Sequence, residues 1–230
     1  MFGTIVNSGA IALGGLIGII LKKGIKEEYS ATIMDGIGLS VIIIGITGGI
    51  KSENIILVIS SIVIGSILGE AIGIEKKLDS IGHKLQTRFG GGDSNFSKAF
   101  VTTSLIYCVG AMAIIGSLEA GIQGNHETLL VKSIIDGISS IIFASTLGVG
   151  VIFAAIPVFI YQGTITLLAS SLKGLLTAQV VNEMSAIGGI LIMAIGINVM
   201  GIKKIKVGNM LPAVFIPIIY FFLANTFGLI

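Results

Sequence analysis

The sequence predicts an all-α integral membrane protein with about eight transmembrane helices. Its 230 residues have a mean hydropathy of +1.04, and 53% of them are hydrophobic. Only 11% are charged, less than half of the roughly 25% usual in soluble domains. A soluble fold of this length could not hide so much apolar surface, because the buried fraction rises only slowly with size. We therefore expect residues 1–230 to form a single membrane domain.

The hydropathy pattern divides the chain into spans. A membrane-crossing helix needs about 20 predominantly apolar residues. Such helices are predicted at 4–21, 32–50, 54–73, 99–118, 129–149, 154–172, 184–201 and 209–228. The run 134–172 is too long for one span at ~1.5 Å per residue. We place a turn there at Gly148, Gly150 and Pro157, and a re-entrant segment at the apolar stretch 151–156 is the alternative.

Basic residues predict the orientation, because cytoplasmic loops are enriched in Lys and Arg. With both chain ends outside, eleven basic residues face the cytoplasm, and only Lys51, Lys132 and Lys173 fall outside. The cytoplasmic set is Lys22, Lys23, Lys26, Lys76, Lys77, Lys84, Arg88, Lys98, Lys203, Lys204 and Lys206. This orientation places the loop 74–98 in the cytoplasm.

The loop 74–98 is predicted to hold an amphipathic helix on the membrane surface. Its apolar residues recur at spacings of three and four, the period of a helix face. They are Ile74, Leu78, Ile81, Leu85 and Phe89, and the run Gly90–Asp93 then leads into the fourth span. Basic residues on the other faces would contact anionic lipid headgroups, namely Lys76, Lys77, Lys84 and Arg88. The alternative is a solvated basic linker.

The chain repeats itself at an offset of 101 residues. The most informative match pairs Asp35 with Asp136, each followed by glycine, because aspartate is rare in this chain. Each copy, 4–73 and 99–172, holds three predicted spans, so the second would enter the membrane from the opposite side. Inverted repeats of this kind occur in many secondary transporters. The sequence thus predicts a 3+3 inverted repeat followed by a C-terminal helix pair, 184–228.

Acidic residues in the spans are the first candidates for a functional site. Asp35 and Asp136 are expected to form cation or proton sites on two sides of a pathway, because an intramembrane charge costs roughly 2.5–3.5 kcal/mol. The structural alternative is that each stabilises a helix N-terminus, where the dipole favours an anion. Glu70 and Glu119, near predicted span ends, would attract cations to the two mouths, although interfacial glutamates are often without function.

Neutral polar side chains in the spans would line the same pathway. The candidates are Asn7, Ser145, Gln162, Ser185 and Asn198. Each alone more commonly joins two helices through a hydrogen bond, for about 0.6 kcal/mol on average. Gln162 is the strongest candidate of the set, because it follows the suspected apolar turn within a span.

No motif indicates an enzyme, a cofactor, a metal site or nucleic-acid binding. Cys108 is the one cysteine, which rules out an internal disulfide, and His83 and His126 have no partners at metal-ligand spacing. The sequence contains no HExxH, Walker loop or nucleophile elbow. We expect the partners to be the lipid bilayer, an unidentified small solute or ion, and further copies of this glycine-rich chain.

Short strings carry a family resemblance that extends over essentially the whole chain. They are Asn7 with Gly14, Gly15 and Gly18, then Gly69–Glu70 with Glu75–Lys76, then 108–119, 132–136, 142–148, 185–189, 201–203 and 207–213. The chain resembles the YdfK/YqgA-like family of uncharacterised bacterial membrane proteins. The resemblance implies a bacterial plasma-membrane protein and brings no activity with it.

The repeat and the intramembrane aspartates favour a transporter or channel for a small solute or ion, with cation or proton coupling through the acidic residues. The alternative is a non-transporting scaffold or accessory subunit. That alternative predicts a dry, fully packed centre.

Overall fold

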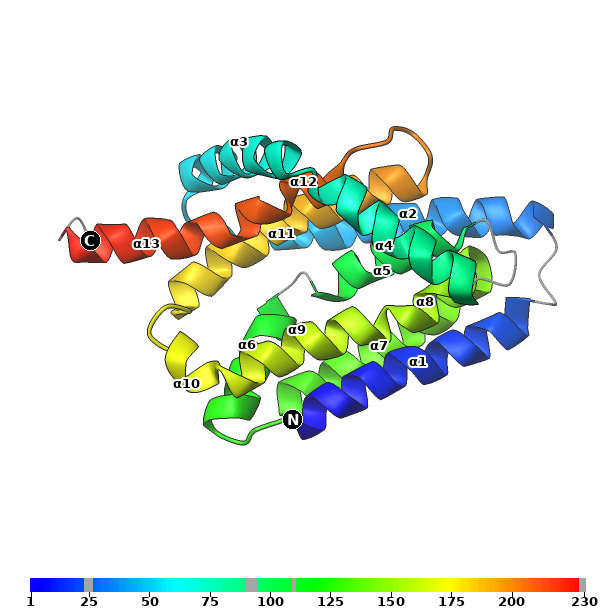
Figure 1. The fold of residues 1–230 in the computed structure, drawn as a ribbon, viewed down its shortest axis with the longest axis horizontal. Helices are drawn as coiled ribbons and strands as arrows, with labels where there is room; N and C mark the ends of the chain where they lie inside the picture. The colour runs from blue at the N-terminus through cyan, green and yellow to red at the C-terminus, as the bar shows by residue number, and fades with distance from the viewer. Residues whose placement is uncertain (23–26, 90–94, 109–110, 228–230) are drawn as a thin grey trace. The chain divides into compact units, whose positions relative to one another are not determined.

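The computed structural model describes residues 1–22, 27–89, 95–108 and 111–227, and these residues form helices joined by short connections (Figure 1). The helices are α1 (Phe2–Lys22), α2 (Glu27–Gly49), α3 (Ile55–Ile72), α4 (Ile74–Phe89), α5 (Phe96–Cys108), α6 (Ala111–Ile122), α7 (Glu127–Leu147), α8 (Gly150–Phe153), α9 (Ala155–Leu167), α10 (Ala169–Leu172), α11 (Ala178–Val199), α12 (Val207–Met210), the 3-10 helix η1 (Leu211–Phe215) and α13 (Ile216–Thr226). The predicted all-α class is confirmed.

Six segments within the described ranges are long and apolar enough to cross a membrane. They are Phe2–Leu21, Ile55–Ile72, Glu127–Leu147, Gly150–Leu167, Ala178–Val199 and Val207–Thr226. The bent pair formed by α5 and α6 makes a seventh if it counts as one span, and Asp35–Gly49 is a shorter apolar helix. The membrane class is confirmed, while the count of eight stays a prediction.

The fourth predicted span, 99–118, differs from the single straight helix that we expected. The structure has two helical segments there, Phe96–Cys108 and Met112–Ile122, which are bent by 59° relative to each other. Hydropathy reports the length of an apolar run and contains no information on its direction. A bend inside such a run is therefore invisible in the sequence pattern.

The long run 134–172 divides near the predicted turn into two membrane-length helical segments, Glu127–Leu147 and Gly150–Leu167. The break lies at Gly148, whose φ of +98° is a conformation that favours glycine. The apolar stretch 151–156 is helical and belongs to α8 and α9, and the re-entrant alternative for it stays a prediction. Val151 and Ala154 are fully buried in protein. Pro157 lies in the first turn of α9, where a missing N–H is tolerated.

The seventh helix begins earlier than predicted. α11 starts at Ala178, six residues before position 184, and Thr177 caps it by accepting a hydrogen bond from the amide of Val180. The prediction stopped at 184 because Glu183 reads as a loop charge. Glu183 is instead fully buried within the helix, where it binds the Ser52–Asn54 turn.

The described residues gather into two compact units. The first comprises the described parts of 1–36, 77–108 and 112–170, and the second comprises the described parts of 37–76, 109–111 and 171–230. In the first unit, α1 lies beside α7 and α9 (Figure 1). In the second unit, α2 and α11 pack backbone to backbone at Gly45 and Gly189.

The contact between α1 and α7 depends on glycine. A β-carbon at Gly14 would collide with the carbonyl oxygen of Gly137, and one at Gly18 would collide with that of Ile141. Small residues of this kind let membrane helices approach closely. The close approach brings the polar residues of the two helices into direct contact.

Candidate functional site

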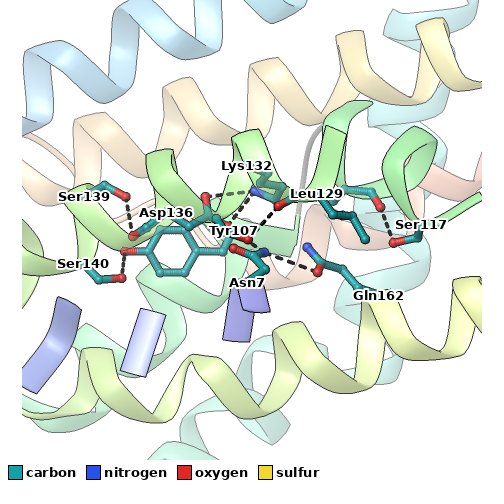
Figure 2. Close-up of polar contacts among 11 residues, drawn as sticks. Asn7, Tyr107, Ser117, Leu129, Lys132, Asp136, Ser139, Ser140 and Gln162 are labelled. Carbon is teal, nitrogen blue, oxygen red and sulfur yellow. Dashed lines mark hydrogen bonds and ion pairs between the residues drawn. The ribbon is translucent and has the colours of Figure 1, made fainter. Parts of the chain in front are cut away.

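Four buried polar residues meet inside the first unit, and we call them the inner polar cluster: Asn7, Lys132, Asp136 and Gln162 (Figure 2). Asn7 comes from α1, Lys132 and Asp136 from α7, and Gln162 from α9. Asn7 and Gln162 are 0% exposed, Asp136 is 4% and Lys132 is 8% exposed. Three helices thus direct charged and amide groups into one interior point.

The centre of the cluster is an ion pair along α7. The Lys132 ammonium nitrogen lies 3.0 Å from Oδ1 and 2.9 Å from Oδ2 of Asp136. The two residues are four positions apart, so they occupy the same helix face. Asp136 lies near the middle of the segment Glu127–Leu147, where hydrocarbon rather than water would surround the helix.

The amide of Asn7 joins the ion pair to α9. Its Nδ2 donates to Oδ2 of Asp136 at 3.1 Å and to Oε1 of Gln162 at 3.3 Å. Both Asp136 oxygens therefore have partners from the cluster. Gln162 occupies the far end of the network.

Tyr107 of α5 flanks the ion pair on a further side. Its hydroxyl group and Oγ of Ser140 lie 2.8 Å apart, and Ser140 follows Asp136 by one turn of α7. The Tyr107 ring is 1% exposed and makes an edge-to-face contact with Phe143. Tyr107 and Ser140 thus lie beside the ion pair in the protein interior.

Several polar atoms beside the cluster have no hydrogen-bond partner among the described residues. They are Oδ1 of Asn7, Nε2 of Gln162, and the hydroxyl groups of Thr4 and Thr166. Thr4 is 0% and Thr166 is 7% exposed. An unpaired buried polar group costs about 1–3 kcal/mol, so each such group calls for an explanation.

Three of the sequence-predicted pathway residues, Asn7, Asp136 and Gln162, come together in this cluster, and others lie elsewhere. Asp35 is exposed on α2. Ser145 and Ser185 donate to carbonyl groups of their own helices, those of Ile142 and Val181. Such hydrogen bonds to a carbonyl group of the preceding helical turn are common for serine in membrane helices.

Asn198 has a local role in the second unit. Its side chain donates to the carbonyl of Ile205 at 2.8 Å and accepts from the amide of the same residue at 2.7 Å. The pair of bonds closes the connection between α11 and α12.

The two glutamates predicted at the mouths bind neighbouring segments. Glu119 accepts a 2.7 Å hydrogen bond from the Thr128 hydroxyl. In the second unit, Glu70 forms an ion pair with Lys206 at 2.7 Å and accepts from Nδ2 of Asn209 at 2.5 Å. The Glu119 contact joins the consecutive helices α6 and α7 of the first unit. The Glu70 contacts join α3 to a segment more than 130 residues later in the second unit.

The predicted amphipathic segment is present as the 16-residue helix α4. Its basic residues Lys76, Lys77, Lys84 and Arg88 are all exposed. The run Gly90–Asp93 lies outside the described residues. The helix is confirmed, and its contact with lipid headgroups remains a prediction.

Lys132 was not predicted as a site residue, because the distribution of basic residues placed it among the outer charges. The spacing of four from Asp136 was the signal that could have found it. Tyr107, Thr4 and Thr166 gave no comparable signal, since many neutral polar residues occur in the spans. Within the described ranges, no group of three His, Cys, Asp or Glu side chains is arranged to hold a metal ion.

Comparison with known proteins places these features in a family. Residues 2–222 match the family described as "Protein of unknown function (DUF554)". The "Uncharacterized membrane protein YdfK" of Bacillus subtilis (strain 168) is 37% identical over 233 residues, covering 100% of this chain and 99% of the relative. The "Uncharacterized protein YqgA" of Escherichia coli (strain K12) is 30% identical over 218 residues, covering 93% of each. No solved structure matches. The chain therefore belongs to the DUF554 family of membrane proteins.

Proposed function

We propose that this protein is a transporter or channel for a small solute or ion, and that the inner polar cluster is its binding site. The observation that carries the proposal is the buried Lys132–Asp136 pair inside a membrane-spanning helix. Ionisable residues within spans are rare, and they commonly mark substrate pathways. The Asn7 amide of α1 contacts the pair and the Gln162 amide of α9 contacts Asn7, as expected of a site between helices.

Stability alone is a weak explanation for this ion pair. Moving two charges out of water often costs more free energy than their mutual attraction recovers. Proteins in which apolar residues replace a buried ion pair are frequently as stable as the original. Asn7 and Gln162 add four further polar atoms in the same place, and two of these, Oδ1 of Asn7 and Nε2 of Gln162, have no partner among the described residues. A purely structural cluster would be expected to satisfy its own hydrogen bonds.

The proposed inverted repeat is supported by the bounds of the helices. Shifting α2 (Glu27–Gly49) by 101 positions gives 128–150, close to Glu127–Leu147 of α7. The same shift moves α3 (Ile55–Ile72) to 156–173, which overlaps α9 (Ala155–Leu167). Secondary transporters commonly use such repeats, and Asp35 would then be the repeat mate of Asp136.

A scaffold or accessory subunit is the second candidate function. The observation in its favour is the complete enclosure of Asn7 and Gln162, which are 0% exposed. A transport site must open to water on at least one side, so a protein that never opens here would be structural. A measurement of solute flux distinguishes the two candidate functions, because a scaffold produces none.

The test is solute flux in liposomes that contain the full chain. We expect Asp136→Asn and Gln162→Leu to lower protein-dependent flux, because both remove members of the inner polar cluster. Asp79→Asn on α4 is the matched control and should leave flux unchanged. Asp35→Asn tests the repeat: reduced flux supports a second site, and unchanged flux removes Asp35 from the pathway. If flux is unaffected by Asp136→Asn and by Gln162→Leu at equal amounts of folded protein, the cluster is not the pathway.

We also propose that the protein lies in the bacterial inner membrane with both termini outside and loop 74–98 in the cytoplasm. Support comes from the exposed basic residues of α4, since cytoplasmic segments are rich in Lys and Arg. Reporter fusions to the C-terminus and within the Gly90–Asp93 run should report opposite sides of the membrane. Equal signals from the two positions would contradict this topology.

A further inference from the structure

The charges of the inner polar cluster are already balanced. Lys132 and Asp136 carry opposite unit charges, and both oxygens of Asp136 lie within 3.1 Å of a donor from Lys132 or Asn7. The described groups that lie near this pair from α1, α5 and α9 are Asn7, Tyr107, Cys108 and Gln162, which are uncharged at neutral pH. An additional ion of either sign would enter without a counter-charge, and burying an unpaired charge is strongly unfavourable.

The atoms that remain unpaired are all neutral. Oδ1 of Asn7 can only accept a hydrogen bond, and Nε2 of Gln162 can only donate one. The hydroxyl groups of Thr4 and Thr166 can do either. A molecule that satisfies these atoms must therefore offer both donors and acceptors, and it needs no net charge.

The unpaired atoms belong to α1 and α9, two helices that contact each other. These two helices are antiparallel, because Gly15 of α1 meets Ile152 just before α9, whereas Thr4 lies near Gly163. Asn7 and Gln162 are in direct contact at 3.3 Å. Thr4 precedes Asn7 by three residues on α1, and Thr166 follows Gln162 by four on α9, so both hydroxyl groups lie toward the same end of the unit.

We infer that the ligand of the inner polar cluster is an uncharged solute bearing hydroxyl or amide groups, bound between α1 and α9 by Thr4, Asn7, Gln162 and Thr166. The inference rests on the proposed transport function and narrows its substrate class. The Lys132–Asp136 pair then acts as a fixed neutral anchor that orients the Asn7 amide. Translocation past this cluster moves no net charge.

The variants Thr4→Val and Thr166→Val test the inference with little change in shape. Each removes one hydroxyl group that has no partner among the described residues, so we expect the unfolding temperature to be unchanged or raised. We expect each to lower solute permeability roughly two- to tenfold, the effect of one lost hydrogen bond to the solute. Thr103→Val is the matched control, because its buried hydroxyl donates to the carbonyl of Ala99 at 2.7 Å.

The measurement uses liposomes containing the full chain, with glycerol and urea as the probes. Swelling after a solute gradient is followed by light scattering, and a voltage-sensitive dye follows the potential under sodium, potassium and chloride gradients. The inference predicts protein-dependent swelling that both threonine variants reduce, without a protein-dependent potential. An ion-driven potential that Gln162→Leu abolishes would overturn the uncharged substrate while keeping transport. Absence of both swelling and potential would overturn transport itself.

Discussion

The ammonium group of Lys132 and the carboxylate of Asp136 are joined one turn apart on α7, at 2.9 and 3.0 Å, within the apolar segment Glu127–Leu147. The pair is buried, so water does not screen it. Asn7 extends the interaction to α1, and through Gln162 to α9. The position of α7 relative to two other helices is thereby coupled to the state of one ion pair.

This coupling predicts a strong non-additivity of single and double variants. Lys132→Met or Asp136→Leu alone should destabilise the protein by about 3–5 kcal/mol, because each leaves an uncompensated buried charge. The double variant should regain much of that loss. Denaturant unfolding in detergent micelles measures the three values. Additive losses would show that the two side chains do not form a pair in the folded protein.

The close approach of α1 and α7 predicts which glycines cannot be replaced. Gly14→Ala places a β-carbon against the carbonyl oxygen of Gly137, so the helices must separate. We expect a loss of about 1–3 kcal/mol from overpacking. Gly9→Ala is the control on the same helix, since no atom lies within 4 Å of its β-carbon position.

Thermal unfolding of the two glycine variants in one detergent checks this prediction. Gly9→Ala should be neutral or stabilising by up to about 1 kcal/mol, the difference in helix propensity. Equal effects of both substitutions would indicate that α1 and α7 are not in backbone contact. The comparison also tests the position of Asn7, because the Gly14 contact fixes the register of α1.

In the second unit, we expect substitution of Glu183 to destabilise the adjacent turn, Ser52–Asn54, rather than the whole protein. Its carboxylate accepts from the Ser52 hydroxyl at 2.6 Å and from the amides of Glu53 and Asn54 at 2.8 and 3.2 Å. Glu183→Leu removes these acceptors and leaves the part-buried amide of Glu53 without this partner, at up to about 1–3 kcal/mol, whereas the Asn54 amide keeps its bond to Oγ of Ser52. Glu183→Gln keeps one acceptor oxygen and should cost less.

Hydrogen exchange of residues 52–57 measures the effect of the Glu183 variants. We expect faster exchange at the start of α3 in Glu183→Leu, and an intermediate rate in Glu183→Gln. Unchanged protection in Glu183→Leu would mean that the N-cap hydrogen bond, which the Leu57 amide donates to Oδ1 of Asn54, holds the turn without the glutamate.

Particular residues show what the sequence could and could not predict. Hydropathy identified the membrane class, and the glycine and proline residues of 148–157 indicated the break at Gly148, because both signals are local. It misplaced the start of α11, because a buried Glu183 looks the same in sequence as one in a loop. It also contained no sign of the 59° angle between the helical segments Phe96–Cys108 and Met112–Ile122.

The candidate site was predictable only in part, because the sequence pattern does not show which helix faces meet. Asp136 and Gln162 stood out because charged and amide side chains are rare in an apolar run. Thr4 and Thr166 did not, because hydroxyl groups in membrane helices usually bond their own backbone. Their lack of a partner among the described residues depends on how α1 faces α9, which no single-sequence pattern contains.

The exposed basic residues of α4 predict a preference for anionic lipid. Lys76, Lys77, Lys84 and Arg88 carry positive charges on an exposed amphipathic helix. Each basic group near an anionic surface contributes about 1 kcal/mol. Replacing all four by glutamine should therefore weaken stabilisation of the purified protein by phosphatidylglycerol but not by phosphatidylcholine. Unfolding temperatures in mixed micelles of each lipid measure the difference, and it should shrink at high salt, because exposed charges are screened. If the two lipids shift the unfolding temperature of the unaltered protein and of the glutamine variant equally, α4 is a solvated basic linker.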